Sequence, residues 1–241
     1  MFKAQVIILA GGKGSRLRPY TTVLPKPLMP IGGYPILEIL IRQLKFMGIE
    51  NIVISTGYLA ELIEAYCGKG EKWGVNIRYV HEEKPLGTAG ALKLVKQTEK
   101  NFLVLNGDVF TDMNFLAFLK WHAQHDAMAS LSVKERRIKI DFGVVGFGKN
   151  HELSGYHEKP EHRSFVSIGV NAFNEQAKSF IQSGESIGMP DLMLRLRDLS
   201  KKVLCYEIRQ EWLDLGRLED LERAQEIIVQ KKNKFIRSLH R

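Results

Sequence analysis

The stretch that decides the fold lies near the N-terminus and reads Gln5-Val6-Ile7-Ile8-Leu9-Ala10-Gly11-Gly12-Lys13-Gly14-Ser15-Arg16-Leu17-Arg18-Pro19. Its first part is a nearly continuous apolar run rich in β-branched residues, which predicts a strand buried on both faces. Glycines end the strand, and without a Cβ their backbone N–H groups can approach a polyphosphate closely. The two arginines that follow can donate to phosphate oxygens. The stretch therefore predicts a strand leading into a phosphate-binding loop, with a ligand-free tight turn as the alternative.

This glycine loop matches neither of two well-known nucleotide-binding patterns. It is not a Walker loop, because GxxxxGK[ST] is missing, and it is not a dinucleotide fingerprint, because Leu17 replaces the third glycine. Further along, Lys26 stands between Pro25 and Pro27 on a stiff segment that cannot become a regular helix. Such a lysine suits an ammonium group that has to stay fixed against a phosphate.

Outward from the loop, the apolar pattern alternates between helices and strands. The pattern predicts helices at 36–47, 59–66, 88–96 and 114–125, and strands at 51–55, 75–80 and 102–105. After residue 127 strands become denser, at 129–133, 142–147, 153–156 and 165–173, before helices return near Gln176 and Asp191. We expect an α/β fold: a Rossmann-like three-layer sandwich with a mostly parallel central sheet and a denser β-rich second half. No linker or repeat interrupts the chain, so residues 1–241 are expected to form one catalytic domain.

Composition narrows the class of protein. Of the 241 residues, 44% are hydrophobic and 26% charged, which is typical of a globular chain. No apolar run is long enough for a membrane helix, and Cys67 and Cys205 do not have zinc-ligand spacing. We expect a cytoplasmic protein with reduced thiols and no membrane partner.

The net charge of +8 has a local source in the basic stretch 231–237, which reads as a solvated helix end. No nucleic-acid-binding module accompanies it, so we expect anionic small molecules rather than nucleic acid as partners. An RNA-binding module that depends on this tail is kept as an alternative.

Five further blocks, read together with the glycine loop, resemble the sugar-phosphate nucleotidyltransferase family. The N-terminal signature continues through Lys26 to about residue 38. The later blocks are Glu83-Lys84-Pro85-Leu86-Gly87-Thr88-Ala89-Gly90-Ala91-Leu92, Asn106-Gly107-Asp108, Phe142-Gly143-Val144-Val145, Glu158-Lys159-Pro160 and Trp212-Leu213-Asp214-Leu215-Gly216. The blocks occur in the family's order and together span nearly the whole chain. The resemblance implies an enzyme that joins a nucleoside triphosphate to a sugar 1-phosphate, with Mg²⁺ as cofactor.

The resemblance also implies roles for the charged residues. Arg16 would grip the triphosphate, Lys26 would neutralise phosphate charge, and Lys159 would position the sugar-linked phosphate. Asp108 follows a strand at the edge where open α/β sheets bind ligands, and with Asp214 it would hold the Mg²⁺. A helix N-cap is the alternative role for Asp108 taken alone.

The remaining site residues implied by the resemblance bind the two substrates. Glu158 would contact sugar hydroxyls, with a surface carboxylate as its alternative, and Gly143 would line the sugar pocket. The nucleotide would lie against the residues Leu9, Ala10, Gly11, Gly12, Gly87, Thr88, Gly90 and Asn106. The histidines at 81, 122, 125 and 157 are expected to be structural or solvent-facing.

One departure from the family pattern limits what can be said about the sugar. Ser167 stands where many relatives have an asparagine that contacts the sugar. The block around Gly87 is similar to guanylyltransferases acting on mannose or heptose 1-phosphate, which favours GTP. Uridylyl-, cytidylyl- and thymidylyltransfer stay open, as does an inactive regulatory homologue, and a homo-oligomer is possible.

Overall fold

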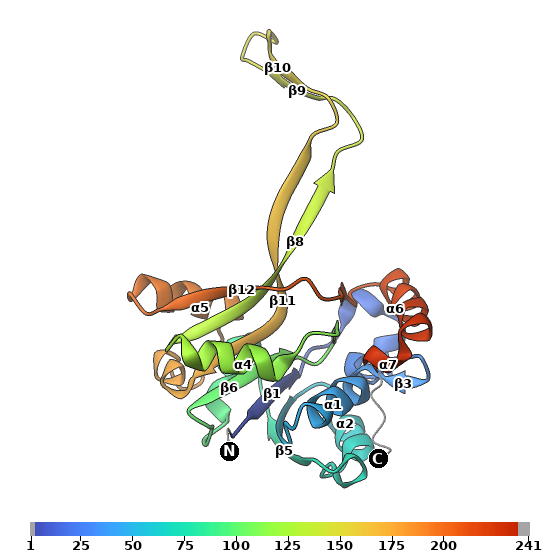
Figure 1. The fold of residues 1–241 in the computed structure, drawn as a ribbon, viewed down its shortest axis with the longest axis vertical. Helices are drawn as coiled ribbons and strands as arrows, with labels where there is room; N and C mark the ends of the chain where they lie inside the picture. Colours follow the sequence, from blue (N-terminus) through green and yellow to red (C-terminus); the bar gives the residue numbers. More distant parts are fainter. Residues whose placement is uncertain (1–2, 236–241) are drawn as a thin grey trace.

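A computed structural model describes residues 3–235 and has a seven-stranded sheet at its centre (Figure 1). The strands are β1 (Gln5–Ala10), β4 (Asn51–Thr56), β5 (Asn76–His81), β6 (Asn101–Asn106), β8 (Ala129–Lys139), β11 (Glu161–Asn174) and β12 (Val203–Glu207), in the order β12-β8-β11-β6-β1-β4-β5. β6, β1, β4 and β5 are mutually parallel, β12 is parallel to β8, and β11 runs antiparallel to both neighbours. The expected mostly parallel sheet is confirmed.

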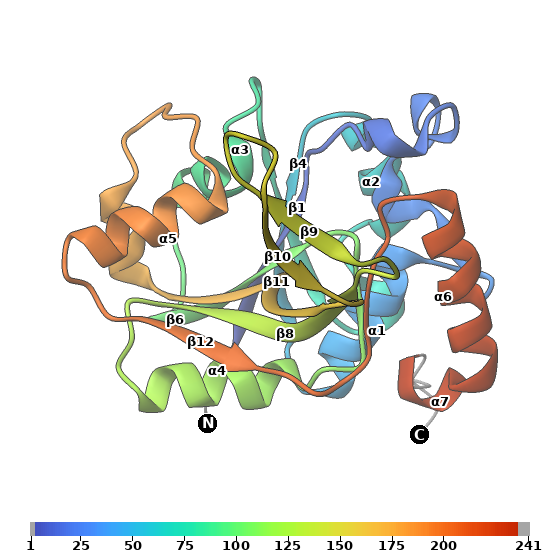
Figure 2. The ribbon, with the colours of Figure 1, turned by 90° about the horizontal axis from the view of Figure 1, so that it is seen from above.

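Helices cover both faces of this sheet because successive residues of β1 point to opposite sides. Val6 and Ile8 join a core with α1 (Ile36–Phe46), α2 (Ala60–Cys67) and α4 (Phe115–Gln124). Ile7 points the other way, into a core with α3 (Gly87–Gly90) and α5 (Met189–Asp198). The view in Figure 2 shows α4 and α5 on opposite sides of the strands. This is the expected three-layer sandwich.

Two predicted helices are wrong in kind or length. The helix expected at 88–96 is the single turn α3 followed by a 3₁₀ turn at Ala91–Leu94. The amides of Ala89 and Gly90 donate to the carbonyl oxygen of Ile187 at 3.0 and 3.2 Å, so this segment is fixed by a distant loop rather than by its own helical ladder. The helix expected near Gln176 is a 3₁₀ turn, Glu175–Phe180.

The proline-rich stretch forms no α-helix, as expected. It folds as the 3₁₀ turns Ser15–Leu17, Tyr20–Thr22 and Lys26–Leu28, followed by the small hairpin of β2 (Pro30–Ile31) and β3 (Tyr34–Pro35). A further 3₁₀ turn, Glu71–Trp73, precedes β5. In the part of the chain that the structure describes, no helix is long and apolar enough to cross a membrane.

The C-terminal segments return to the first half of the chain. β13 (Trp212–Asp214) pairs antiparallel with β7 (Val109–Thr111), and α6 (Leu218–Gln230) and α7 (Lys232–Phe235) follow. Phe235 is fully buried and stacks on Phe110 with ring centroids 4.3 Å apart, while Lys231 forms an ion pair with Glu211. The expectation of a solvated helix end is therefore wrong for Phe235 and confirmed for residues 232–234, which are exposed, and the rest of the basic tail lies outside the described residues.

A two-stranded projection, called the arm here and comprising residues 134–167, rises away from the body (Figure 1). β8 and β11 stay paired far beyond the ends predicted from sequence, and β9 (Val144–Phe147) with β10 (Leu153–His157) forms a separate hairpin at the tip. The denser β-rich second half is thus partly an extension of the main sheet and partly this arm.

We expect Phe235→Ala to lower the free energy of unfolding by about 3–5 kcal/mol, because it removes a fully buried ring and leaves a cavity beside Phe110. Chemical denaturation monitored by circular dichroism measures the change. Val229→Ala on α6 is the control: its side chain is exposed, so we expect a change within about 0.5 kcal/mol. Equal effects of the two variants would contradict the packing of α7.

Candidate active site

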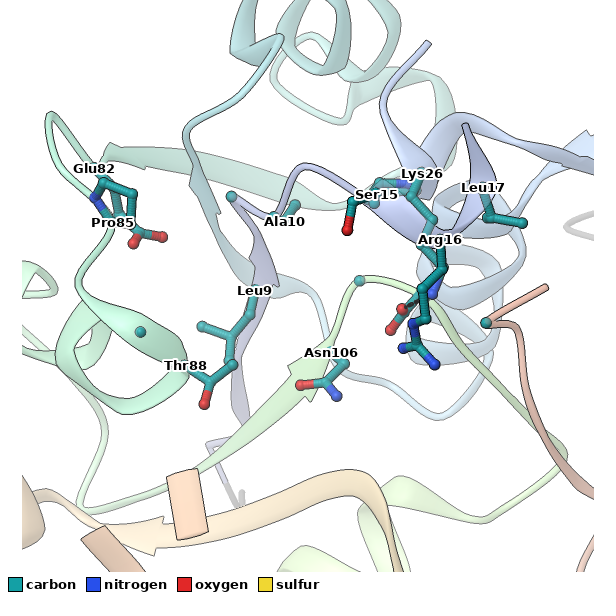
Figure 3. Close-up of a pocket in the computed structure, with 18 residues that line it drawn as sticks. Leu9, Ala10, Ser15, Arg16, Leu17, Lys26, Glu82, Pro85, Thr88 and Asn106 are labelled. Atoms are coloured by element: carbon teal, nitrogen blue, oxygen red, sulfur yellow. Dashed lines mark hydrogen bonds and ion pairs between the residues drawn. The ribbon is translucent and has the colours of Figure 1, made fainter. Parts of the chain in front are cut away.

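A cavity of about 380 Å³ opens at the carboxyl edge of the sheet, where the glycine loop follows β1. Of the residues expected at the site, it is lined by Leu9, Ala10, Gly11, Gly12, Arg16, Lys26, Gly87, Thr88, Asn106 and Asp108. Figure 3 shows Glu82, Pro85 and Thr88 at one end and Arg16 and Lys26 at the other, with Asn106 between them. One end of the cavity is therefore suited to a neutral or donor-bearing ring, and the other to anionic groups.

The two glycines that follow β1, Gly11 and Gly12, have different surroundings. A Cβ on Gly11 would lie 2.6 Å from the Glu82 carboxylate, so a side chain there would displace Glu82. A Cβ on Gly12 would meet no atom within 4 Å, so its backbone faces open space in the cavity. Gly14 adopts φ +60°, and Thr21 donates to its carbonyl oxygen at 2.9 Å, which fixes the turn. The loop presents its backbone to the cavity in a defined shape.

Each cation of the site is compensated by one of the two aspartates. Lys26, on the turn between its two prolines, is largely buried and donates to the Asp108 carboxylate. Arg16 is more exposed, with Nη1 3.8 Å from Oδ2 of Asp214. A Cβ on Gly216 would come within 2.6 Å of that guanidinium nitrogen, so a glycine lets Arg16 lie there. The site therefore has its positive and negative groups interleaved.

Asp108 and Asp214 meet although they are far apart in sequence. β13 pairs with β7 with Asp214 opposite Val109, which places it beside the residue that follows Asp108. Both aspartates line a second cavity of about 180 Å³, together with Asn106 and Ser167. The two carboxylates thus border the same cavity, and their sharing of one metal ion stays a prediction.

These donors fit Mg²⁺. The ion commonly takes one or two carboxylates and completes its octahedron with water and substrate phosphates. Among residues 3–235 there is no cluster of three or more His, Cys, Asp or Glu side chains able to hold a metal by themselves. Asp108 and Asp214, which both line the second cavity, are suited to the two-carboxylate kind of site.

Four expected site residues lie elsewhere. Gly90 is buried, where a Cβ would be 2.5 Å from the carbonyl oxygen of Glu185, so packing accounts for this glycine. Gly143, Glu158 and Lys159 are on the arm and line neither of these cavities. A Cβ at Gly143 would collide with the Tyr156 ring within the arm.

Sequence reasoning missed Glu82, which lines the cavity beside Gly11. Its carboxylate accepts from the Ser55 hydroxyl at 3.1 Å and from the Leu86 amide at 3.2 Å, and both bonds orient it. The signal was present, because Glu82 directly follows β5 at the same edge as Asp108, but it was hidden beside the second carboxylate of Glu83.

The histidines expected to be structural include His122, which is fully buried and hydrogen-bonded through Nδ1 to the Ser130 hydroxyl at 2.8 Å. Burial lowers the pKa of His122 to about 4. It lies on α4, away from the two cavities.

Comparison with known proteins settles the family. The nucleotidyl transferase family model matches residues 5–231. The chain belongs to this family. The resemblance carried by the sequence blocks is thereby confirmed.

Two curated relatives differ in the nucleotide that their names give. The chain is 31% identical over 240 residues to the UTP–glucose-1-phosphate uridylyltransferase of Synechocystis sp., covering 91% of this chain but only 62% of that protein. It is also 31% identical to the D-glycero-alpha-D-manno-heptose 1-phosphate guanylyltransferase of Aneurinibacillus thermoaerophilus, covering 92% of this chain and 96% of the relative.

A solved structure supports the fold. HddC from Yersinia pseudotuberculosis, complexed with GMP-PN, superimposes with a TM-score of 0.72 at 23% identity, covering 93% of this chain and 99% of that one. The agreement extends over nearly the full length of both chains.

We expect Lys26→Met to raise the affinity of the ligand-free protein for Mg²⁺ by about tenfold, because the ammonium group now neutralises Asp108 and competes with any added cation. Calorimetric titration, or Mn²⁺ titration followed by electron paramagnetic resonance, measures it. Lys45→Met, which removes the ammonium that pairs with Glu50 far from the cavity, is the matched control and should leave the affinity unchanged. An unchanged affinity in Lys26→Met would show that the Lys26 ammonium group does not compete with a cation for the Asp108 carboxylate.

Proposed function

We propose that this chain transfers a nucleoside monophosphate from a nucleoside triphosphate to a sugar 1-phosphate, releasing pyrophosphate. The observation that carries the proposal is the convergence of Arg16, Lys26, Asp108 and Asp214 on one glycine-lined edge of the sheet. The uridylyltransferase and guanylyltransferase to which the chain is similar have activities of this kind by name. We further propose that residues 1–241 act as one catalytic domain and that the enzyme works in the cytoplasm, where its two free cysteines stay reduced.

The proposed chemistry needs no general base. The second ionisation of a phosphate monoester lies near pH 6, so the acceptor is largely a dianion at neutral pH. The barrier comes from repulsion between two anions and from charge that develops on the leaving pyrophosphate. An acceptor oxygen attacks the α-phosphorus, and the bond to the bridging oxygen of pyrophosphate breaks on the opposite side.

The residues of the site remove that repulsion. Arg16 and Lys26 neutralise the triphosphate, and the backbone of Gly11 and Gly12 holds it at the end of β1. Mg²⁺, when bound by Asp108 and Asp214, supplies further positive charge at the reacting phosphates. Arg16 and Lys26, which pair with Asp214 and Asp108 in the structure, would face phosphate oxygens if those carboxylates held a metal ion.

GTP is the proposed nucleotide. Glu82 is held at the end of the cavity opposite Arg16 and Lys26, where the base of a nucleotide would extend. An ionised carboxylate only accepts hydrogen bonds, and guanine presents adjacent N1–H and N2–H donors that match its two oxygens. The Thr88 Oγ1 accepts from the Met189 amide at 2.8 Å, which orients the hydroxyl and leaves its O–H to donate to a carbonyl oxygen of the base. Uridylyl, cytidylyl or thymidylyl transfer is the second candidate, supported by the name of the Synechocystis relative.

For the sugar we propose a mannose- or heptose-like 1-phosphate. Ser167 and Asn106 line the second cavity, beside the two aspartates, and are the side chains placed to contact its hydroxyls. Lys159, Glu158 and Gly143 are proposed to act on the same substrate from the arm. An inactive regulatory homologue is not favoured, because every charged group that the reaction needs is present.

We expect Asp108→Asn and Lys26→Ala each to fold normally and to lower turnover by about a hundredfold or more, since removing one such group typically costs on the order of 3 kcal/mol at the transition state. Pyrophosphate release with Mg²⁺, GTP and mannose 1-phosphate or a heptose 1-phosphate is the assay. Asp198→Asn, on the exposed end of α5, is the control and should keep full activity. Near-wild-type rates in Asp108→Asn would refute the proposed reaction.

We expect Glu82→Gln to shift base preference from GTP toward UTP or dTTP by about ten- to hundredfold, because an amide both donates and accepts, as uracil and thymine require. The ratio of kcat/KM values for GTP and UTP measures the shift. Glu83→Gln is the matched control, since Glu83 is exposed and does not line the cavity. An unaltered ratio would remove Glu82 from base recognition.

A further inference from the structure

A third cavity, of about 540 Å³, adjoins the candidate active site along β13. Trp212, Leu213 and Asp214 line it and also line the second cavity, and Arg16 lines it and also the first. The other lining residues come from the base of the arm and from the start of α6, and they are Lys134, Glu135, Arg136, Arg217, Glu219, Asp220 and Arg223. The proposed reaction uses none of this second group.

Three guanidinium groups in the third cavity have no anionic partner. Among residues 3–235, the side chains of Arg136, Arg217 and Arg223 take part in no ion pair or hydrogen bond, and all three are exposed. A guanidinium group offers forked N–H donors and stays charged at physiological pH. Several such groups around one hollow are suited to an anion with several oxygens, such as a phosphate.

The carboxylates of the third cavity do not cancel these charges, because three of the four are already engaged. The engaged groups are Glu135 with Arg137 at 2.7 Å, Asp214 with Arg16 at 3.8 Å, and Asp220 with the backbone amide of Arg217 at 2.8 Å. Within the described part of the chain, only Glu219 among the four has no partner. Lys134 adds another positive charge, since its ammonium group donates to the neutral carbonyl oxygen of Gln210. An anion could therefore bind here without displacing an existing ion pair.

The position of the third cavity indicates which anion it would receive. Three of its lining residues are shared with the second cavity, where the sugar is proposed to bind. The leaving pyrophosphate already has Arg16 and Lys26, and the reacting phosphate of the acceptor is directed toward the metal carboxylates. The end of the sugar remote from C1 is the part of the substrates that is left to extend past Trp212.

We propose that the third cavity binds a second phosphate of the acceptor, carried on the carbon farthest from C1. The preferred acceptor is then a mannose- or heptose-like sugar bisphosphate, of which only the phosphate at C1 reacts. Arg136, Arg217 and Arg223 donate to the oxygens of the other phosphate and hold the sugar by its far end. Charge-assisted hydrogen bonds of this kind are roughly twice as strong as neutral ones. This assignment rests on the proposed function and narrows its substrate class.

Binding of two probes to the full chain tests the third cavity without an assay of activity. By calorimetry at physiological salt, we expect the dissociation constant of mannose 1,6-bisphosphate to be at least about tenfold lower than that of mannose 1-phosphate, because the added phosphate gains charge-assisted hydrogen bonds. In the double variant Arg217→Gln/Arg223→Gln, the ratio of the two constants should fall to about two or less.

The double variant Arg78→Gln/Arg197→Gln is the matched control. It removes the same charge from two exposed arginines on β5 and α5 that line none of the three cavities. We expect it to keep the wild-type ratio of dissociation constants. The control separates a local site from the general attraction of a basic protein for a more highly charged ligand.

The same preference should appear in turnover. With Mg²⁺ and GTP, we expect kcat/KM for pyrophosphate release to be about tenfold higher with the bisphosphate than with mannose 1-phosphate, mainly through a lower KM. The variant at Arg217 and Arg223 should lose this preference, and the control variant should retain it.

Three results would overturn the third cavity as the site of a second acceptor phosphate. The first is a bisphosphate that binds no more tightly than the monophosphate, and the second is a preference that both double variants keep or both lose. The third is a loss at Arg217 and Arg223 that weakens binding of inorganic pyrophosphate as strongly as that of the bisphosphate, which would assign these arginines to the leaving group. If neither acceptor releases pyrophosphate from any nucleoside triphosphate, the proposed function fails, while calorimetry still decides whether the cavity binds the second phosphate.

Discussion

The turn after β6 can lie against the end of β1 because residue 107 has no side chain. The Gly107 amide donates to the carbonyl oxygen of Leu9 at 2.8 Å, and a Cβ there would be 2.9 Å from the same oxygen. This contact holds Asn106 and Asp108 beside the glycine loop. It also sets where β7 begins, and β7 is the strand that β13 pairs with to bring in Asp214. One backbone approach thus aligns the glycine loop with both carboxylates.

Each positively charged side chain of the site forms an ion pair with one of the two aspartates. A largely buried lysine without a partner would be unfavourable, and the Asp108 carboxylate offsets it. The same pairing fixes the positions of both side chains at the edge of the cavity. The more exposed pair of Arg16 and Asp214 contributes little to stability. Its value lies in holding Arg16 at the rim of the cavity.

Much of the fold could be predicted from sequence because burial on both faces leaves an unmistakable pattern. β1, β4, β5 and β6 are apolar runs between turn residues, and each was expected within a residue or two of its observed ends. The outer part of β8 could not be found this way, since residues 134–139 have no buried face and hence no apolar periodicity. α3 was overestimated because its glycines serve a contact with residues 185–187 that local sequence does not reveal.

The site residues also differ in how far the sequence alone could predict them. The glycine loop and Lys26 could be argued from residue chemistry alone, whereas the partnership of Asp108 with Asp214 came only through family resemblance. Glu82 needed the three-dimensional arrangement, because only that shows a carboxylate facing the cavity beside Gly11. Gly143, Glu158 and Lys159 were expected to line the sugar pocket. They lie on the arm instead, and their distance from the cavities follows from the long pairing of β8 with β11.

The pairing of β13 with β7 has a consequence for synthesis of the protein on the ribosome. A nascent chain that has emerged as far as Asp108 already contains the glycine loop and can pair its first parallel strands. The second carboxylate, and the stacking of Phe235 on Phe110 that secures the returning segment, become available only when far later residues leave the exit tunnel. The glycine loop and Asp108 are therefore synthesised long before Asp214, and the candidate site can be assembled only after the returning segment has been made.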